Sequence, residues 1–472
     1  MKRHRPSEGG SPPRESRRLF GTDGVRGIPG KTPLTRREVR ALGWAAARAF
    51  LSRRPASNGR APLAVLGRDT RSSGTWLCRS LIEGFAEAGC ATLDAGVIPT
   101  PAVSYLVPRR GAVLGAVVSA SHNPPEFNGI KFFDASGLKA SPEVEGEVER
   151  SLLPGARSPS RIRSFAPASL RADPSAEEDY LDFLRSTFPA TRDLRGLRLV
   201  LDGAHGAASR LAPDFFRSLG AEVFALGCSP DGSNINRGCG ALETGRMREE
   251  VVRRRAHAGI SLDGDADRAI LADEHGRLFD GDALIAMSAL AMHEKGMLWK
   301  DKVVLTVMSN LGLIRHLEGK GIGAVLVPVG DRNVTEALNE GGYALGGENS
   351  GHIVFRRLAP TGDGMLTSLQ ALAVLVEEGG PMSRFRHPYR SYPQILRNIH
   401  IKERVPLDKL RGFRRVLARA ESALKGRGRV FVRYSGTEPL LRILVEGPEH
   451  GEVSRLGGAL ESEYRKETMS CP

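Results

Sequence analysis

The sequence predicts an α/β protein of several domains, and three observations carry this prediction. Hydrophobic runs typical of buried strands alternate with amphipathic helical segments, which is the arrangement of βαβ units with parallel sheets. Clusters of small and polar residues follow several of these runs, at the strand ends where open α/β sheets hold their chemistry. The chain has 472 residues. Because that length is too great for one hydrophobic core, we expect three or four domains.

The composition is that of an ordinary globular protein, with 40% hydrophobic residues and no apolar run that approaches the ~20 residues of a membrane span. Residues 1–18 are rich in proline, serine and arginine and lack the apolar core of a signal peptide, so we interpret them as a disordered basic tail. Five scattered cysteines without the paired spacing of a zinc site predict a cytoplasmic protein.

The formal net charge of +14 raises the question of nucleic acid binding. The basic residues are spread along the chain, however, and aromatic residues make up only 6% of it, too few for base-stacking platforms. We therefore expect anionic small molecules as partners, and neither nucleic acid nor a membrane.

The first polar segment is FGTDGVRG, residues 20–27. Its glycines let the backbone approach a ligand and its arginine can clamp a phosphate, although a tight turn is the simpler interpretation. A strand over residues 63–66 then leads through GRDTRSSG, residues 67–74, into an amphipathic helix. A polar loop at a helix start is a natural anion site, unless Ser72 or Ser73 is only the N-cap.

A third polar segment, SASHNPPEFNGIKFF, covers residues 119–133 and follows a hydrophobic run that predicts a buried strand over residues 111–118. It offers two hydroxyls, the imidazole of His122 and the ammonium of Lys131. A nucleophilic serine, here Ser121, needs an activating base and compensation for the charge on the oxygens it transfers. A simple turn begun by Asn-Pro is the alternative, and this stretch alone supports the two interpretations about equally.

A stretch without periodicity, residues 154–175, predicts a domain boundary, and strand and helix patterns resume beyond it. Asp263, Asp265 and Asp267 then alternate in DGDADR, between two β-like apolar runs. Three carboxylates at alternate positions cannot share a helix face, but a tight loop can direct all three to one cation, and oxygen ligands suit magnesium better than zinc. A calcium EF-hand loop is the competitor, but it requires glycine where this chain has Arg268, and it requires helical flanks.

A third set of strands and helices predicts another α/β unit, which leads to GGENSGH, residues 346–352. After a loosely patterned segment, residues 379–392, a helix over residues 408–424 opens a smaller final domain. Its strand runs into RYSGTEP, residues 433–439, which is followed by Arg442. Hydroxyls, backbone N–H groups around the glycine and two arginines together form a phosphate-binding nest.

These strings resemble the motifs of the α-D-phosphohexomutases, enzymes that move a phosphoryl group between two hydroxyls of one sugar. SASHNP with NGIKFF is similar to the active-site loop of that family, and DGDADR is similar to its metal loop. GENSGH resembles the sugar-recognition loop and RYSGTEP the phosphate loop. The motifs stand in the family's order from residue 20 to about residue 447, and FGTDGVRG resembles the opening of the phosphoglucosamine branch in particular.

The resemblance implies a fold of four domains around a central cleft: three related α/β units with mixed sheets, and a small C-terminal α+β domain that binds phosphate. After the tail, residues 1–18, the expected domains are residues 19–155 with the serine loop, residues 156–270 with the metal loop, residues 271–380 with the sugar-recognition loop, and residues 381–472 with the phosphate-binding loop.

The resemblance also implies roles for individual residues. Ser121 would be the phosphorylated nucleophile and, with the three aspartates, a ligand of one Mg²⁺ per active site. Lys131 or His122 would be the general acid/base, and Arg268 would face the reacting phosphate. The remaining expected positions are Glu348, Ser350 and His352 for the sugar, then Arg433, Ser435, Gly436, Thr437 and Arg442 for phosphate, and Thr22, Arg26 and Arg68 as additional active-site residues.

The implied activity is the interconversion of glucosamine 6-phosphate and glucosamine 1-phosphate, with glucosamine or glucose 1,6-bisphosphate as activator. It would supply the synthesis of UDP-N-acetylglucosamine and cell-wall precursors, by a monomer or homodimer. Asn349 stands where that branch commonly has glutamine, so a phosphomannomutase/phosphoglucomutase is the nearer alternative. A noncatalytic sugar-phosphate-binding protein is the more distant one, and it would not need Ser121, the three aspartates and Lys131 together.

Overall fold

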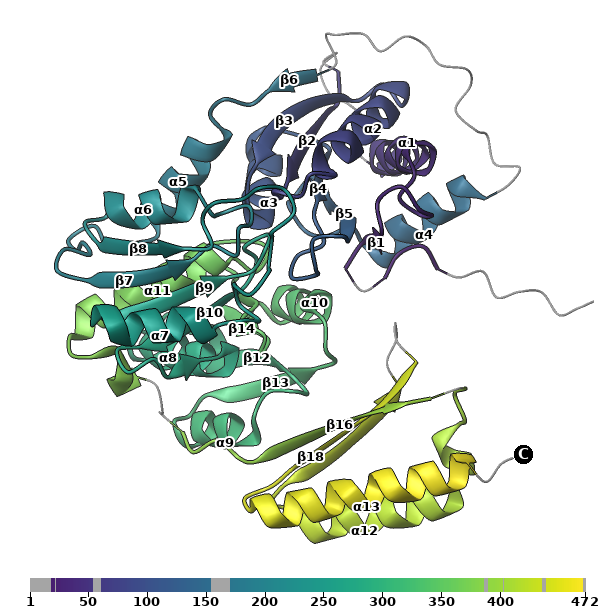
Figure 1. Ribbon diagram of the computed structural model, residues 1–472, viewed down its shortest axis with the longest axis vertical. Coiled ribbons are helices and arrows are strands. Elements are labelled where there is room, and N and C mark those ends of the chain that lie inside the picture. The colour runs from purple at the N-terminus through teal and green to yellow at the C-terminus, as the bar shows by residue number, and fades with distance from the viewer. Residues whose placement is uncertain are drawn as a thin grey trace, which may run out of the picture.

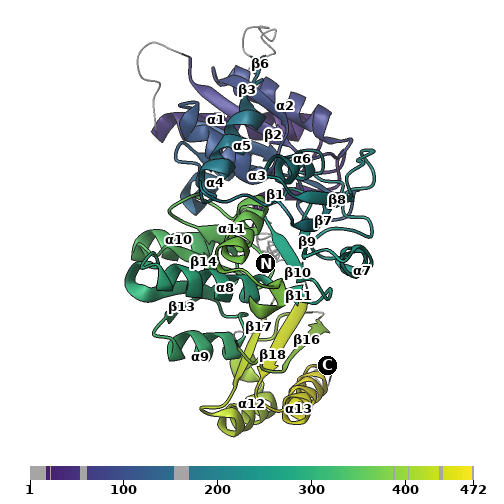
Figure 2. The ribbon, with the colours of Figure 1, turned by 90° about the vertical axis from the view of Figure 1, so that its left-hand side faces the viewer.

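The structure is a computed structural model, and it describes residues 18–21, 23–53, 61–153, 170–385, 389–401, 403–434 and 439–469. The predicted tail, apart from its last residue, lies outside these ranges. The same holds for four of the predicted site residues, which are Thr22, Ser435, Gly436 and Thr437. Four sheets follow one another along the chain, and the first and fourth units lie at opposite ends of the long axis of the molecule (Figures 1 and 2).

The first unit contains a six-stranded mixed sheet in the order β1-β5-β4-β2-β3-β6, in which β5 runs antiparallel to both of its neighbours. Its strands are β1 (Val25–Gly27), β2 (Leu63–Arg68), β3 (Ala91–Val97), β4 (Leu114–Val118), β5 (Asn128–Asp134) and β6 (Leu170–Ala172). Its helices are α1 (Arg36–Arg53), α2 (Gly74–Glu87), α3 (Thr100–Arg109) and α4 (Pro142–Leu152).

The second unit contains a five-stranded sheet in the order β11-β10-β9-β7-β8, in which β8, β7 and β9 are parallel and β10 is antiparallel. Its strands are β7 (Arg198–Asp202), β8 (Glu222–Leu226), β9 (Ala258–Leu262), β10 (Ala269–Asp273) and β11 (Leu278–Phe279). Its helices are α5 (Ala176–Ser186), α6 (Leu211–Ser218) and α7 (Gly245–Arg254).

The third unit contains a four-stranded sheet in the order β13-β12-β14-β15, in which only β15 is antiparallel to its neighbour. Its strands are β12 (Lys302–Thr306), β13 (Gly323–Val327), β14 (Leu345–Gly347) and β15 (Ile353–Phe355). Its α-helices are α8 (Gly281–Glu294), α9 (Leu311–Gly319), α10 (Asp331–Gly341) and α11 (Gly364–Glu378), with short 3₁₀ turns at η2 (Trp299–Asp301) and η3 (Met382–Phe385).

The fourth unit is smaller, with an antiparallel sheet in the order β16-β18-β17 whose one face carries both long helices (Figure 1). Its elements are β16 (Gln394–His400), η4 (Leu407–Lys409), α12 (Arg411–Leu424), β17 (Arg429–Tyr434), β18 (Leu440–Glu446) and α13 (His450–Met469). The predicted helix over residues 408–424 is thus present, with a 3₁₀ turn as its first part.

The three α/β units share one strand pattern. Counted from β2, β7 and β12, the first strand of each unit pairs in parallel with the second and the third, and the third pairs antiparallel with a fourth. The loop between the third and fourth strands is in every unit one of the predicted functional loops, at residues 119–127, 263–268 and 348–352. The predicted fold, three related α/β units with mixed sheets and a small terminal domain, is confirmed.

Two of the expected domain boundaries do not coincide with the limits of these sheets. Strand β6 lies beyond residue 156, yet it pairs with β3 of the first sheet. Strands β10 and β11 extend the second sheet past residue 270. Both differences come from backbone pairing between distant segments, which the hydrophobic pattern of the sequence does not show.

The first three units share one hydrophobic core, and the fourth unit has a core of its own. One continuous apolar cluster runs through Phe133 of the first unit, Leu201 of the second and Leu305 of the third. The fourth unit has a cluster of its own, around Phe413 and Ile443. In the part of the chain that the structure describes, no helix is long and apolar enough to cross a bilayer.

A buried polar anchor joins the fourth unit to the third. Glu446 at the end of β18 is fully buried, and its Oε1 accepts a hydrogen bond of 2.7 Å from the backbone N–H of Leu311. That N–H group belongs to the first turn of α9, where a carboxylate is favourable. Arg429 donates to Glu446 Oε2 at 2.6 Å and also donates to the backbone carbonyl of Ser309. The fourth unit is therefore held at one end of its sheet.

Candidate active site

Ser121 lies directly beyond β4, in the loop that leads to β5, and is fully buried. Its φ is +52°, in the left-handed region that costs a non-glycine residue roughly 1–2 kcal/mol. Its Oγ donates a hydrogen bond of 2.7 Å to Asp263 Oδ2 and lies 3.3 Å from Nδ1 of His122. The structure thus brings the predicted nucleophile of the first unit onto the metal loop of the second.

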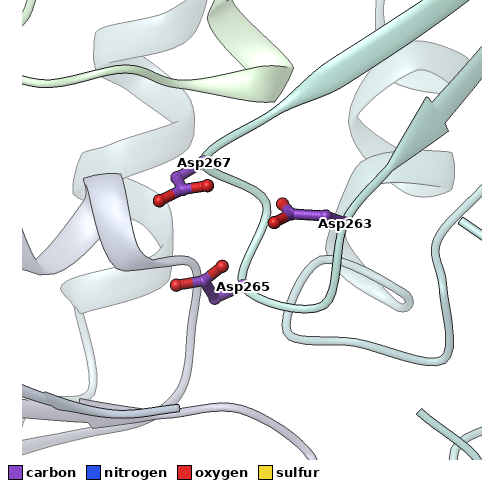
Figure 3. Close-up of side chains that lie close together, drawn as sticks. All are labelled: Asp263, Asp265 and Asp267. Carbon is purple, nitrogen blue, oxygen red and sulfur yellow. The ribbon is translucent and has the colours of Figure 1, made fainter. Parts of the chain in front are cut away.

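The three aspartates of that loop converge, as Figure 3 shows, and one oxygen of each lies within 4.8 Å of the others. Burial, together with the charges of Asp267 and Asp265, raises the pKa of Asp263 well above its usual value. Among the described residues, Oδ1 of Asp265 and Oδ1 of Asp267 are buried without a hydrogen-bond partner. Carboxylate oxygens that are gathered, buried and unpaired are the donor set of a hard divalent cation, so these residues fit Mg²⁺.

The EF-hand interpretation of the aspartate loop is wrong. Its flanks are the antiparallel strands β9 and β10, where an EF-hand has two helices. The loop is a tight turn, in which the backbone N–H of Ala266 donates to the carbonyl of Asp263 at 3.0 Å and that of Arg268 donates to Asp263 Oδ1 at 3.2 Å.

Lys131 on β5 is buried among carboxylates. Its Nζ lies 2.9 Å from Asp265 Oδ2, 2.9 Å from Asp23 Oδ2 and 3.5 Å from Asp267 Oδ2. Burial alone would lower the pKa of Lys131, but these three charges outweigh it and raise that pKa well above its usual value. The side chain of Lys131 is therefore protonated at neutral pH. Asp23 stands in FGTDGVRG, where the sequence pointed to Thr22 and Arg26 instead.

His122 and two arginines, Arg26 and Arg268, also lie at the serine loop. Nδ1 of His122 accepts a hydrogen bond of 3.3 Å from Arg268, and Arg26 donates to the side-chain oxygen of Asn123 at 3.1 Å. Burial, and then the charges of Arg268 and Arg26, lower the pKa of His122 to about 4. Its imidazole is consequently neutral at neutral pH. Among the described residues, Nε of each arginine is buried without a hydrogen-bond partner, which leaves a donor for an anion.

The sugar-recognition loop, residues 348–352, lies beside the metal loop, because the backbone N–H of Ala269 donates to the carbonyl of Gly351 at 3.2 Å. Glu348 is nearly buried and accepts a hydrogen bond of 3.0 Å from the backbone N–H of Gly330, and within the described chain Ser350 Oγ is buried without a partner. His352 is only 1% exposed, and its Nδ1 lies 3.7 Å from Asp267 Oδ2. His352 thus lies beside Asp267 of the metal loop, and its Nε2 accepts a hydrogen bond of 3.2 Å from the backbone N–H of Gly362.

Arg433 and Arg442 are cross-strand partners on β17 and β18. They line a small cavity together with Met308 and Val329 of the third unit. Burial, and then the charge of Arg442, lower the pKa of Arg433, because two adjacent guanidinium groups repel each other. A phosphate would relieve this repulsion with charge-assisted hydrogen bonds.

Arg68 does not join these groups. It ends β2, and its guanidinium pairs at 3.1 Å with Asp94 on β3, the neighbour of β2 on the side opposite β4. Another residue of the same GRDTRSSG loop, Arg71, bonds to the serine loop, and so does Asn236 of the second unit. Neither Arg71 nor Asn236 had a recognisable signal in the sequence beyond the polar character of its loop.

A cavity of about 510 Å³ opens beside Asn236, and both His122 and Asp263 line it.

Comparison with known protein families gives matches to four models, in order along the chain. They are the phosphoglucomutase/phosphomannomutase alpha/beta/alpha domain I at residues 17–155, domain II at residues 178–276, domain III at residues 280–392, and the C-terminal domain at residues 396–461.

Among individual proteins, a phosphoglucosamine mutase of Bdellovibrio bacteriovorus is 42% identical over 452 residues, which are 95% of this chain and 98% of that protein. A crystal structure of a phosphoglucomutase/phosphomannomutase family protein from Burkholderia thailandensis has a TM-score of 0.79 at 22% identity, covering 97% of this chain and 99% of that one. The N-acetylphosphoglucosamine mutase of Aspergillus fumigatus, solved with GlcNAc-6P and magnesium, has a TM-score of 0.66 at 18% identity over 95% of this chain and 96% of that one.

Proposed function

This chain belongs to the phosphoglucomutase/phosphomannomutase family, and from that premise we propose that it interconverts glucosamine 6-phosphate and glucosamine 1-phosphate. The observation that carries the proposal is the hydrogen bond from Ser121 Oγ to Asp263, the first of three convergent aspartates. A binding protein without catalysis would have no use for a serine hydroxyl seated on a cation site. Relatives that are 42–44% identical and are named phosphoglucosamine mutase favour glucosamine over mannose or glucose.

The reaction begins with phosphorylated Ser121. A free hydroxyl of the sugar monophosphate forms a new O–P bond as the bond from Ser121 Oγ to phosphorus breaks, and the sugar becomes a bisphosphate. After the sugar has turned round, Ser121 Oγ takes the other phosphoryl group and the isomeric monophosphate leaves. One nucleophile has to serve both ends of the sugar, so the reorientation is a necessary step.

Asp263, Asp265 and Asp267, with Ser121, would hold Mg²⁺. When bound, the ion neutralises charge on the oxygens of the transferring group. The proton transfers belong to this chain's own residues. Lys131, kept protonated by its carboxylate neighbours, donates a proton to Oγ when the phosphoryl group leaves, and the neutral imidazole of His122 can accept the proton of a sugar hydroxyl.

Recognition of the sugar falls to Glu348 and Ser350, since a carboxylate suits a protonated 2-amino group. Arg433 and Arg442 hold the phosphate that is not reacting.

Asn349, the departure from the phosphoglucosamine branch, keeps a phosphomannomutase/phosphoglucomutase as the second candidate. The Aspergillus enzyme, with GlcNAc-6P and magnesium in its structure, supports a phosphorylated amino sugar and Mg²⁺ as ligands of this chain. Glucosamine or glucose 1,6-bisphosphate would act as activator by phosphorylating Ser121.

The described cysteines are free, in keeping with a reducing compartment, so we place the reaction in the cytoplasm. There it would supply UDP-N-acetylglucosamine and cell-wall precursor synthesis, and a monomer or homodimer stays the predicted state.

The test is a mutase assay that compares the 6-phosphates of glucosamine, mannose and glucose, with Mg²⁺ and a bisphosphate activator. We expect the highest kcat/KM with glucosamine 6-phosphate, one phosphoryl group on the Ser121 peptide by mass spectrometry, and no turnover in Ser121→Ala. A higher kcat/KM with mannose 6-phosphate would favour the second candidate function, that of a phosphomannomutase/phosphoglucomutase. Turnover that persists in Ser121→Ala would reject the mechanism.

A further inference from the structure

Arg71 lies in the loop between β2 and α2, and its side chain is completely buried. A guanidinium group has five N–H donors, and here each of them has an acceptor. Nε donates to Asp69 Oδ2 at 2.9 Å. The other four donors all reach backbone carbonyls of the serine loop, namely those of Ser121 at 3.1 Å, Asn123 at 2.8 Å, Phe127 at 2.9 Å, and Pro124.

Asn236 approaches the same loop from the second unit. Its side-chain amide donates to the carbonyl of Ser121 at 2.8 Å and to the carbonyl of Asn123 at 3.0 Å. These two carbonyls therefore receive one donor from Arg71 and one from Asn236, which uses both lone pairs of each oxygen. The backbone of Asn236 is itself left-handed, with φ of +59°, a conformation that asparagine tolerates.

The peptide on the other side of Ser121 is held as well. The N–H of Ser121 donates to Ser119 Oγ at 2.9 Å, and Ser119 Oγ donates to Asp69 Oδ2 at 2.7 Å. Asp69 is the carboxylate that also accepts from Arg71. Since the left-handed φ of Ser121 is unfavourable for a serine by itself, contacts from outside the loop have to maintain it.

We propose that Arg71 is the positioning residue of the nucleophile, and that it acts together with Asn236 to hold Ser121 Oγ against the aspartates of the second unit. Arg71 touches no reacting atom, because all of its donors are used by Asp69 and the loop backbone. The proposal rests on the proposed function only in taking Ser121 as the nucleophile.

Arg71→Lys is the informative substitution. Lysine keeps a positive charge near Asp69, but its three donors share one atom and cannot span four carbonyls. Misplacement of a reacting group by about 1 Å costs about 100-fold in rate. We therefore expect kcat to fall by about 100-fold in Arg71→Lys. KM for the sugar phosphate should stay within about twofold, because Arg71 does not contact substrate.

A double-mutant cycle with Asn236→Ala separates positioning from general destabilisation. The rate of phosphoryl transfer from glucose 1,6-bisphosphate to Ser121 is measured by intact mass in both single variants and in the double variant. Because Arg71 and Asn236 donate to the same two carbonyls, we expect their effects on this rate to be non-additive. Amide hydrogen exchange in the peptide of residues 121–127 should rise in each variant.

Arg110→Lys is the matched control. Arg110 is also multidentate, with bonds to Asp173 at 2.7 and 3.0 Å and to Ser175 at 3.0 Å, but it joins α3 to the segment before α5. Its replacement should lower the thermal midpoint and leave kcat and the exchange of residues 121–127 unchanged. If Arg71→Lys does not fold, Asn236→Ala alone carries the test.

Wild-type transfer rates in Arg71→Lys and Asn236→Ala would overturn the proposal, and so would unchanged exchange in the serine loop. If the wild-type protein turns over no sugar phosphate, the proposed function fails. The exchange measurement still decides whether Arg71 and Asn236 hold the loop.

Discussion

Replacing Gly264 by alanine is expected to slow phosphoryl transfer without unfolding the protein. Gly264 stands between Asp263 and Asp265 in the metal loop. A Cβ atom at this position would lie 2.5 Å from the carbonyl oxygen of Ser121 and 3.0 Å from Nδ2 of Asn236. The nearest obstacle is backbone, which cannot rotate away, so the serine loop and the metal loop would have to separate.

The separation can be estimated from the contact distances. An ordinary van der Waals contact of a Cβ atom begins at 3.4 Å, so the carbonyl of Ser121 would retreat by roughly 0.9 Å. A displacement of about 1 Å at a reacting group costs about 100-fold in rate, or about 2.7 kcal/mol of activation free energy. Overpacking costs about 1–3 kcal/mol of stability, less than the 5–15 kcal/mol by which domains are typically stable.

The assay compares kcat and the thermal midpoint of the wild-type protein, Gly264→Ala and Gly245→Ala. The last variant adds the same methyl group at the start of α7, where nothing lies within 4 Å, and should behave as the wild type. A Gly264→Ala protein with the wild-type kcat would refute the reasoning, since it would mean that the two loops can part without consequence for Ser121.

Three further predictions follow from other parts of the molecule. Asp265→Asn should weaken Mg²⁺ binding by at least about 100-fold, because a carboxylate of the cation site is lost. Titration calorimetry on chelator-treated protein measures this affinity, and an unchanged value would mean that Asp265 is no ligand. Arg442→Ala should raise KM for the sugar phosphate by about tenfold or more, while Ser121 still accepts a phosphoryl group at saturating bisphosphate. An unchanged KM would mean that Arg442 does not bind the substrate phosphate. Burial, and then the charge of Asp280, raise the pKa of Asp282 to about 7. Because this folded-state value lies above the unfolded value near 4, the folded protein binds the proton more tightly, and stability falls as the pH rises from about 4 to about 7. Between pH 5 and pH 8, the free energy of unfolding of Asp282→Asn, measured with urea, should therefore fall by up to about 3 kcal/mol less than that of the wild type. Parallel pH profiles of the two proteins would contradict this role of Asp282.

The sequence predicted those site residues that stand close together in short motifs. Ser121 and the three aspartates stand in short strings, and the structure brings these strings together. The contacts that fix them are not local: Arg71 bonds to a carbonyl 50 residues away, and Asn236 to one 115 residues away. No spacing rule connects such pairs, because the strand order that makes them neighbours is set by the fold as a whole.

The contacts of other expected residues also depend on distant segments. Arg68 seemed suited to an anion because its loop starts a helix, but its side chain follows β2 toward β3 and finds Asp94 there. His352 stands in a sugar-recognition string, yet the return of β15 beside β14 turns it toward Asp267. Glu446 stands at a strand end outside every motif, and nothing in the sequence marks it as the buried attachment of the final domain.

That attachment has a mechanical consequence. Glu446 and Arg442 belong to the same strand, four residues apart, which at about 3.3 Å per residue places the arginine about 13 Å from the pivot. The strand then acts as a lever arm, and a rotation of about 10° around Glu446 carries Arg442 through about 2 Å. This travel is enough to make or break a hydrogen bond to a phosphate oxygen. A swing of this size would let the final domain grip and release a phosphate while the carboxylate of Glu446 stays buried.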